Sequence, residues 1–236
     1  MKPDLIGLCG VSGSGKDTIG KSLCDSHGFV RVAVADPIKE VLMTLFDLNR
    51  DQLWGDRRNE FIERIGGAPR QLFQEFGDFC EAMDPEVWMR PLCRHIAQQQ
   101  NLDKRVVVTD VRTEHAAETV RRLGGKLWLV RRPGSGAPGA LGQHRHECEL
   151  SGKPAEYFDH VIDNFGTKVR LAVLIDIALL GGSAKQQDEL KEEAVNLREE
   201  ESPHELVADS QRAKSVLPAP VVGQSQRVAT WQMTIP

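Results

Sequence analysis

Residues 10–16 read Gly-Val-Ser-Gly-Ser-Gly-Lys, and this stretch decides the fold. The apolar run Leu-Ile-Gly-Leu-Cys at 5–9 precedes it, and a helical pattern with Ile19 and Leu23 on one face follows. Glycines at these spacings let the backbone curl so that successive N–H groups point at one anion, and the helix N-terminus adds its dipole. Strand, glycine-rich turn and helix in this order predict a phosphate-binding P-loop, with Lys16 as the cation that reaches the phosphates.

This loop and the first helical turn after it supply most of the predicted ligands for the phosphates of a nucleotide. The residues are Gly10, Ser12, Gly13, Ser14, Gly15, Lys16, Asp17 and Thr18. Asp17 stands where most P-loops carry the Ser or Thr that binds Mg²⁺, and Thr18 is turned away from that position by about 100°. We expect Asp17 and Thr18 to reach the metal through water; a first-turn acid that only favours the helix dipole is the alternative for Asp17.

Further strands and helices alternate along the chain as far as residue 180. Predicted strands cover 29–34, 105–109, 126–130 and 160–162, and predicted helices follow Asp36-Pro37, Ala68-Pro69 and Asp84-Pro85 or cover 114–123 and 169–180. Such alternation implies right-handed crossovers and a parallel sheet that is covered on both faces. The predicted fold class is α/β, a doubly wound three-layer sandwich with a mostly parallel five-stranded sheet, which is the P-loop NTP hydrolase fold.

The helix after residue 36 shows the start signal most clearly. Asp36 is the predicted N-cap and Pro37 takes the first helical position. An apolar stripe at helical spacing is expected to be buried. The stripe consists of Ile38, Val41, Leu42 and Leu45.

Composition bounds the location and the partners of the chain. Its 236 residues are 40% hydrophobic and 27% charged, with a formal net charge of −4. Because it has no dense basic block, no apolar run of membrane-spanning length and no signal-peptide pattern, we expect no nucleic-acid or membrane partner. Five scattered cysteines without a CxxC pair favour free thiols in the cytoplasm.

The composition changes after Gly181-Gly182. Residues 184–201 are highly charged with a helical repeat of apolar positions, and 202–236 show no sustained periodicity. We therefore predict one domain over 1–182 and an appendage over 183–236, made of a charged helix and a flexible C-terminal tail.

Several segments in order resemble the deoxynucleoside monophosphate kinases of tailed bacteriophages and their prophage relatives. They are Gly15-Lys16-Asp17-Thr18, Ala35-Asp36-Pro37-Ile38-Lys39, Pro69-Arg70-Gln71-Leu72-Phe73-Gln74 with Gly77, Asp110-Val111-Arg112 and Asn164-Phe165-Gly166-Thr167. The resemblance spans residues 4–175. It implies ATP and Mg²⁺, a nucleoside monophosphate acceptor, a bacterial or phage-infected cell, a helical acceptor-binding segment at about 37–100 and a lid at about 131–152. Relatives also suggest a homodimer.

The acceptor is expected to bind on the helical segment. Arg70 and Gln74 are one turn apart, so they share a face that offers a guanidinium to the acceptor phosphate and an amide to a base edge. The resemblance adds Asp36 and Lys39. A solvated helix face is the alternative for the first pair, and capping alone is the alternative for Asp36. The continuation Asp-Phe-Cys-Glu at 78–81 lacks the acid-plus-arginine pattern expected in this family. The sequence therefore does not indicate which nucleobase the acceptor carries.

Asp110 is predicted at the carboxyl end of the most hydrophobic strand, where ligands bind in open α/β sheets. It resembles the acid that organises Mg²⁺-bound water in P-loop kinases, and Arg112 would clamp the transferred phosphoryl group or the acceptor phosphate. A helix cap is the alternative for Asp110.

The predicted lid supplies further cations. Arg131 and Arg132 open it and Arg145 lies within it, and such arginines neutralise charge during transfer. Asn164, Gly166 and Thr167 are placed at the ATP site by the resemblance alone. A zinc site is an alternative for part of this region, although its spacing matches no standard site. It would use His144, His146, Cys148 and His160.

These residues predict direct in-line transfer from ATP to a (deoxy)nucleoside 5′-monophosphate, without an essential general base. Catalysis would rest on Lys16, Asp110, Arg112, Arg131 and Arg132. The alternatives are a dephospho-coenzyme A kinase, a phosphomevalonate kinase of the animal type, or a regulatory protein that binds nucleotide without catalysis.

Overall fold

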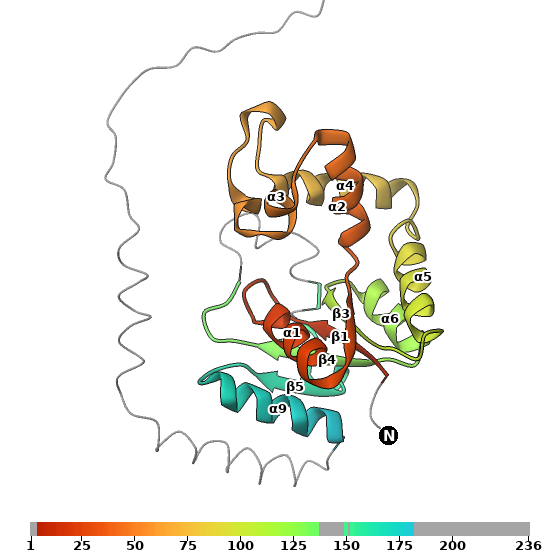
Figure 1. Cartoon of the computed structure of the whole chain (residues 1–236), viewed down its shortest axis with the longest axis vertical. Coiled ribbons are helices and arrows are strands. Elements are labelled where there is room, and N and C mark those ends of the chain that lie inside the picture. The colour runs from red at the N-terminus through yellow and green to blue at the C-terminus, as the bar shows by residue number, and fades with distance from the viewer. Residues whose placement is uncertain (1–3, 137–148, 151, 182–236) are drawn as a thin grey trace, which may run out of the picture. The chain divides into compact units, whose positions relative to one another are not determined.

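The computed structural model describes residues 4–136, 149–150 and 152–181 (Figure 1). All of these residues lie in the first of two compact units of the chain, Met1–Val195. The predicted charged helix and tail at 183–236 and most of the predicted lid lie outside the described residues. The domain boundaries therefore stay predictions.

Five strands form one sheet in the order β2-β3-β1-β4-β5. The strands are β1 (Leu5–Cys9), β2 (Phe29–Val32), β3 (Arg105–Val111), β4 (Lys126–Arg131) and β5 (His160–Asp163). Every pairing between neighbours is parallel, and β1 occupies the centre. The turn after β1 therefore lies at the carboxyl edge of the sheet, between the neighbouring strands β3 and β4.

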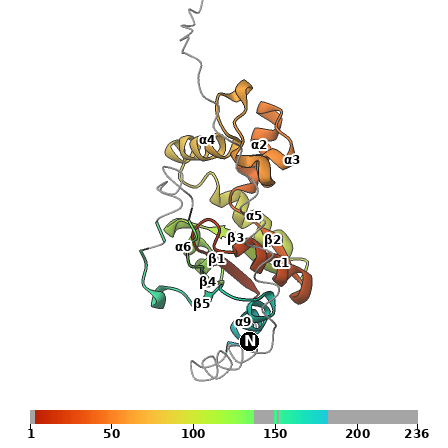
Figure 2. The same ribbon diagram turned by 90° about the vertical axis from the view of Figure 1, so that its left-hand side faces the viewer.

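Helices connect these strands and cover the sheet. They are α1 (Lys16–His27), α2 (Asp36–Phe46), α3 (Arg50–Trp54), α4 (Pro69–Met83), α5 (Met89–Gln100), α6 (Glu114–Arg122) and α9 (Lys168–Leu180), with short 3-10 helices η1 (Asp56–Asn59), η2 (Glu63–Ile65) and η3 (Ala155–Tyr157). Figures 1 and 2 show α2, α3 and α4 grouped together, away from α9. Of the helices that the structure describes, none is both long and apolar enough to cross a lipid bilayer.

The central strand explains why helices lie on both faces. Successive side chains of a strand alternate, so Leu5 and Cys9 enter one core while Ile6 and Leu8 enter the other. Helices α5 and α6 cover the first face, and α1 and α9 cover the second. The predicted three-layer α/β fold is confirmed. Burial raises the pKa of the Cys9 thiol to about 12, which keeps this free cysteine protonated.

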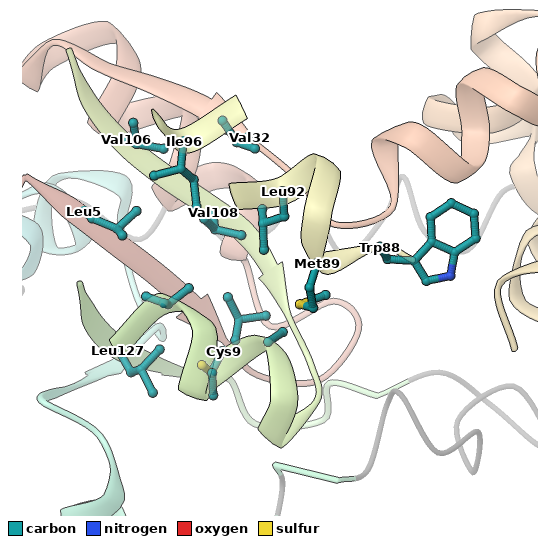
Figure 3. Close-up of a cluster of buried hydrophobic side chains, with 14 of the residues drawn as sticks. Leu5, Cys9, Val32, Trp88, Met89, Leu92, Ile96, Val106, Val108 and Leu127 are labelled. Carbon is teal, nitrogen blue, oxygen red and sulfur yellow. The ribbon is translucent and has the colours of Figure 1, made fainter. Parts of the chain in front are cut away.

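Figure 3 shows how α5 closes the first core. Its Leu92 and Ile96 lie over Val108 and Val106 of β3, and all four side chains are buried. Burial of apolar side chains of this size stabilises the fold by about 1.5–3 kcal/mol each. This contact anchors α5 to the sheet.

Two predictions about helix α2 are wrong. Its N-cap is Ala35, and Asp36 is the first helical residue. Val41 and Leu45 were expected in the core, but they are 39% and 64% exposed, and only Ile38 and Leu42 of the predicted stripe are buried. Because α2 packs against α3 and α4 rather than on the sheet, a narrower stripe suffices to bury it.

The helix predicted after Asp84-Pro85 begins later, at Met89. The carboxylate of Asp84 accepts the N–H of Glu86 at 3.0 Å. Residues 85–88 form turns, so the helix does not begin directly after Asp84. No periodic pattern had indicated the short elements α3, η1 and η2, which connect α2 to α4.

Close packing of α1 on β3 depends on Gly20. A Cβ at this position would lie 2.6 Å from Cγ2 of the buried Thr109. We predict that Gly20→Ala lowers the free energy of unfolding by about 1 to 2 kcal/mol, since overpacking outweighs the gain in helix propensity. Equilibrium denaturation measures the effect. Thr109→Ser removes Cγ2 and should restore most of the loss in the double variant; additive losses would contradict the contact.

Candidate active site

The turn after β1 has the backbone that its glycines permit. Gly10, Gly13 and Gly15 have φ angles of 138°, 78° and 100°, in a region that other residues rarely adopt. A Cβ at Gly10 would lie 2.4 Å from the carbonyl oxygen of Val130, and one at Gly15 would lie 2.0 Å from Nδ2 of Asn164. All three glycines are therefore favoured by conformation, and Gly10 is required by close packing against the backbone as well, as in a P-loop.

Lys16 points back into this turn and is only 6% exposed. Its Nζ donates to the carbonyl oxygens of Gly10 at 2.6 Å and Val11 at 2.7 Å, and lies 3.5 Å from Oγ of the buried Ser14. Gly10 and Ser14 shape the loop in this way, but they do not line the main pocket, which opens beside the loop. A polyphosphate in the loop would compete with these carbonyls for the same ammonium group.

The connection from β5 to α9 braces the loop from behind. Asn164 donates from Nδ2 to the carbonyl oxygen of Ser14 at 2.8 Å and from its backbone N–H to the carbonyl of Arg131 at 2.8 Å. Thr167 caps α9, because its Oγ1 accepts the N–H of Arg170 at 3.2 Å, and Gly166 has a φ of 95°. Asn164, Gly166 and Thr167 do not line the pocket beside the loop, and they do not line a smaller cavity next to Arg131. Their contact with ATP therefore stays a prediction.

A pocket of about 790 Å³ opens beside the loop. Among the described residues that line it, eight are basic and three are acidic, although the whole chain carries a net charge of −4. The basic residues are Lys16, Lys21, Arg31, Lys39, Arg58, Arg70, Arg112 and Arg132. Such a concentration of positive charge attracts polyanions.

Helix α4 turns one face into the pocket. Arg70 and Gln74 both line it and are 7% and 9% exposed, so their predicted shared face is confirmed and the solvated-face alternative is wrong. Gly77 and Glu81 continue the same stripe. An Nη of Arg70 also lies 3.5 Å from Oγ of Ser12, so α4 reaches the P-loop through this side chain.

Asp110 lies within β3 rather than after it, and it organises the neighbouring connection. Its two carboxylate oxygens accept the N–H groups of Val34 at 2.7 Å and Ala35 at 2.9 Å, which ends β2 early and starts α2. Thr113 caps α6 instead, with its Oγ1 3.2 Å from the N–H of Ala116. The helix-cap alternative for Asp110 is therefore wrong.

Asp36 lies beside the pocket but does not line it. Its carboxylate accepts two hydrogen bonds from the guanidinium of Arg31, at 2.7 and 3.3 Å. It also accepts the indole N–H of Trp54 at 2.7 Å. These contacts replace the predicted cap, because the side chain points across to α3 and β2 and makes no hydrogen bond to the start of its own helix.

Lys39 lines the pocket, and its role as a ligand stays a prediction. Its Nζ lies 5.3 Å from the ring centroid of Trp54 and 5.3 Å from that of Phe73. Burial lowers the pKa of this lysine, while the nearby carboxylates oppose the shift. Sequence reasoning missed Trp54 and Arg58, which also line the pocket; the adjacent pair Arg57-Arg58 was the available signal.

The predicted lid arginines lie in different surroundings. Arg132 lines the main pocket together with Arg112. Arg131 binds Asp163 of β5 at 2.8 and 3.0 Å and lines a smaller cavity of about 260 Å³. Arg145 lies outside the described residues.

The zinc alternative is mostly outside the described residues as well, since these exclude His144, His146 and Cys148. His160 is described, and its ring lies edge-on to the ring of Trp128 at 5.6 Å. Within the described part of the chain, no three His, Cys, Asp or Glu side chains come together as a metal site would require.

The residues present do fit Mg²⁺ held mainly by water and phosphate. Asp17, Thr18 and Asp110 all line the main pocket. Each oxygen of Asp110 accepts one backbone N–H and keeps a second lone pair. Mg²⁺ usually binds through one or two carboxylates plus waters and substrate phosphates, so a dedicated protein cage is not needed.

A parallel sheet in this order, a glycine-rich turn with its lysine after the central strand, and a cationic pocket at the carboxyl edge define a protein of the P-loop class.

Comparisons of the sequence with known proteins agree with that class. The sequence model of the deoxynucleotide monophosphate kinase family matches residues 67–173. A protein of Acanthamoeba polyphaga mimivirus, provisionally described as a deoxynucleotide monophosphate kinase, is 29% identical over 174 residues, which are 68% of this chain and 88% of the relative. The resemblance to deoxynucleoside monophosphate kinases is confirmed. Among solved structures, dephospho-CoA kinase from Campylobacter jejuni is 13% identical with a TM-score of 0.42, over 84% of this chain and 96% of that one.

Asp110 should stabilise the protein even without nucleotide. We predict that Asp110→Asn lowers the free energy of unfolding by about 2 kcal/mol, because an amide replaces one of the two charged acceptors for backbone N–H groups. Equilibrium denaturation in metal-free buffer measures this. Asp17→Asn is the control: its side chain is exposed, and it should change stability by less than about 0.5 kcal/mol. Equal effects of the two variants would contradict the structural role.

Proposed function

We propose that the chain transfers the γ-phosphoryl group of ATP to a deoxynucleoside 5′-monophosphate and releases ADP and a deoxynucleoside diphosphate. The observation that supports this best is that one pocket is lined both by the P-loop and by a second group of cations. Lys39, Arg58 and Arg70 come from α2, η1 and α4, outside the P-loop. A protein that only bound one nucleotide would have no need for the second group.

On the donor side, the curled backbone after β1 binds the phosphates of ATP. Lys16 exchanges the carbonyl oxygens of Gly10 and Val11 for phosphate oxygens, and the N-terminus of α1 adds its dipole. Arg132 lies at the edge of the same pocket and neutralises charge there. Mg²⁺, reached by Asp17, Thr18 and Asp110 through water, would offset the phosphate charge when it is bound.

On the acceptor side, the cations of α2, η1 and α4 bind the monophosphate. Gln74 makes no side-chain hydrogen bond among the described residues, although it is 9% exposed, so its amide is available to a base edge. Phe73 and Trp88 add apolar surface to the same pocket, and the indole N–H of Trp88 donates to the carbonyl oxygen of Gly77 at 3.1 Å. The pocket thus offers both cationic and apolar side chains, which suit the phosphates and the base of a nucleotide.

The chemistry needs no side-chain nucleophile. An oxygen of the acceptor phosphate attacks the γ-phosphorus as the bond to the β,γ-bridging oxygen breaks, and ADP leaves with that electron pair. Positioning and charge neutralisation supply the catalysis. We assign this role to Arg112, and its position supports the assignment: it directly follows β3, two residues beyond Asp110, and lines the pocket.

A substrate panel tests the proposal. Coupled detection of ADP should show turnover with deoxynucleoside monophosphates and none with dephospho-coenzyme A or phosphomevalonate. Lys16→Ala and Arg112→Ala should each lower kcat at least about a hundredfold, as loss of one charge-stabilising group does in other enzymes. No turnover with any monophosphate would refute the proposal. Tight nucleotide binding without turnover would favour the regulatory alternative.

Arg58 provides a sharper test of the acceptor side. We predict that Arg58→Ala raises KM for the monophosphate about ten- to a hundredfold, the loss expected for one charge-assisted contact, and leaves KM for ATP within about twofold. Initial-rate kinetics with each substrate varied measure both constants. Arg57→Ala is the matched control, because Arg57 is exposed, pairs with Glu60 at 2.8 Å and does not line the pocket. A rise in KM for ATP instead would mean that Arg58 contacts the donor nucleotide, and it would contradict the assignment of Arg58 to the acceptor.

A further inference from the structure

Lys39 has an unusual environment for a lysine in a binding pocket. Among the described residues no hydrogen bond or ion pair holds its Nζ, and the contacts that do hold it are the rings of Trp54 and Phe73, both at 5.3 Å. A cation within about 6 Å of a ring centroid is attracted by the ring quadrupole. The three N–H donors of the ammonium group therefore remain available to a ligand in the pocket.

Trp54 is itself held in place. Its indole N–H donates to Oδ1 of Asp36 at 2.7 Å, and Arg31 binds the same carboxylate through two hydrogen bonds. The three partners come from α3, α2 and β2. The orientation of the Trp54 ring is therefore fixed through Asp36 by Arg31 of the sheet, although α3 itself has only five residues.

We propose that Trp54 and Phe73, with Asp36 as the anchor of the indole, form an aromatic clip that positions the ammonium of Lys39 toward the phosphate of the acceptor monophosphate. This inference rests on the proposed function. It assigns Trp54 and Asp36 as positioning residues, which act through Lys39 and do not contact the reacting atoms.

Rings suit this task better than a carboxylate would. A carboxylate beside Lys39 would occupy its donors and repel the incoming dianion, whereas an aromatic face attracts the cation and leaves its donors open. The rings also exclude water, which strengthens the later interaction with phosphate. The cost is partial desolvation of the lysine in the empty pocket.

The charges that face Lys39 set the direction of its pH response. Burial is the largest influence and lowers its pKa, Asp110 and Asp36 raise it, and Arg31 and Arg58 lower it further. A phosphate dianion favours the charged form. Affinity for the acceptor should therefore be greatest while Lys39 is protonated, and KM should rise as the pH rises through its pKa.

Removal of the Trp54 ring should weaken binding of the monophosphate and, at the same time, raise the pKa of Lys39. In Trp54→Ala the ammonium is less precisely placed, so KM for the monophosphate rises about tenfold, equivalent to about 1.4 kcal/mol, with KM for ATP within about twofold. The same ammonium gains water, so its pKa rises and the alkaline limb of the acceptor pH profile moves to higher pH. Trp54→Phe keeps a ring but loses the bond to Asp36, and should lie between.

The first measurement is independent of activity. NMR titration of protein with ¹³C-labelled lysine, with Lys39 assigned through Lys39→Arg, should show its pKa below the usual range and higher in Trp54→Ala. Phe61→Ala is the matched control, since this aromatic side chain of the same helical segment is 71% exposed and does not line the pocket. An unchanged Lys39 titration in Trp54→Ala would overturn the aromatic clip.

Kinetics on the same folded variants, checked by denaturation midpoint, complete the test. If wild-type protein turns over monophosphates but Trp54→Ala and Phe61→Ala have equal KM values for them, the clip is refuted while the kinase function stands. If the titration shifts as expected but no monophosphate reacts, the clip exists and the proposed function fails. A specific rise in acceptor KM together with the shifted alkaline limb supports both.

Discussion

The structure depends on one constraint, the tight turn between β1 and α1. Gly10 cannot carry a side chain, because the backbone carbonyl of Val130 occupies the space, and Gly15 has a φ of 100°, which other residues rarely adopt. The bond from Asn164 to the carbonyl of Ser14 ties the turn to the far edge of the sheet. Contacts with the neighbouring strands and with the β5–α9 connection thus hold the loop in its curled conformation.

The second half of the site is connected to this turn through Asp110. Its carboxylate fixes the connection that leads into α2, and α2 carries Lys39 toward the pocket. Arg70 closes the arrangement from α4 by approaching Ser12 of the loop. The P-loop and the cations of α2 and α4 are therefore linked by a continuous set of contacts, as the proposed transfer between two bound phosphates would require.

The parts that sequence predicted were local in the chain. The P-loop, the alternation of strands and helices, and the shared face of Arg70 and Gln74 all follow from spacings of a few residues. The partners of Asp110 are 76 and 75 residues away, so its hold on the turn before α2 could not be read from spacing. Trp54 lies in a stretch with no periodic pattern, and Asp36 satisfied a capping rule that the tertiary contact with Arg31 overrode.

The central claim is that one pocket holds two phosphate groups face to face, and a crystal structure with a bisubstrate analogue tests it most directly. An adenosine linked through five phosphates to a deoxynucleoside should lie with its adenosine-side phosphates in the P-loop. Lys16 should then leave the carbonyls of Gly10 and Val11, and the far phosphate should contact Lys39 or Arg58. An empty loop with Lys16 still bound to those carbonyls, or a far phosphate that points to solvent, would contradict the account.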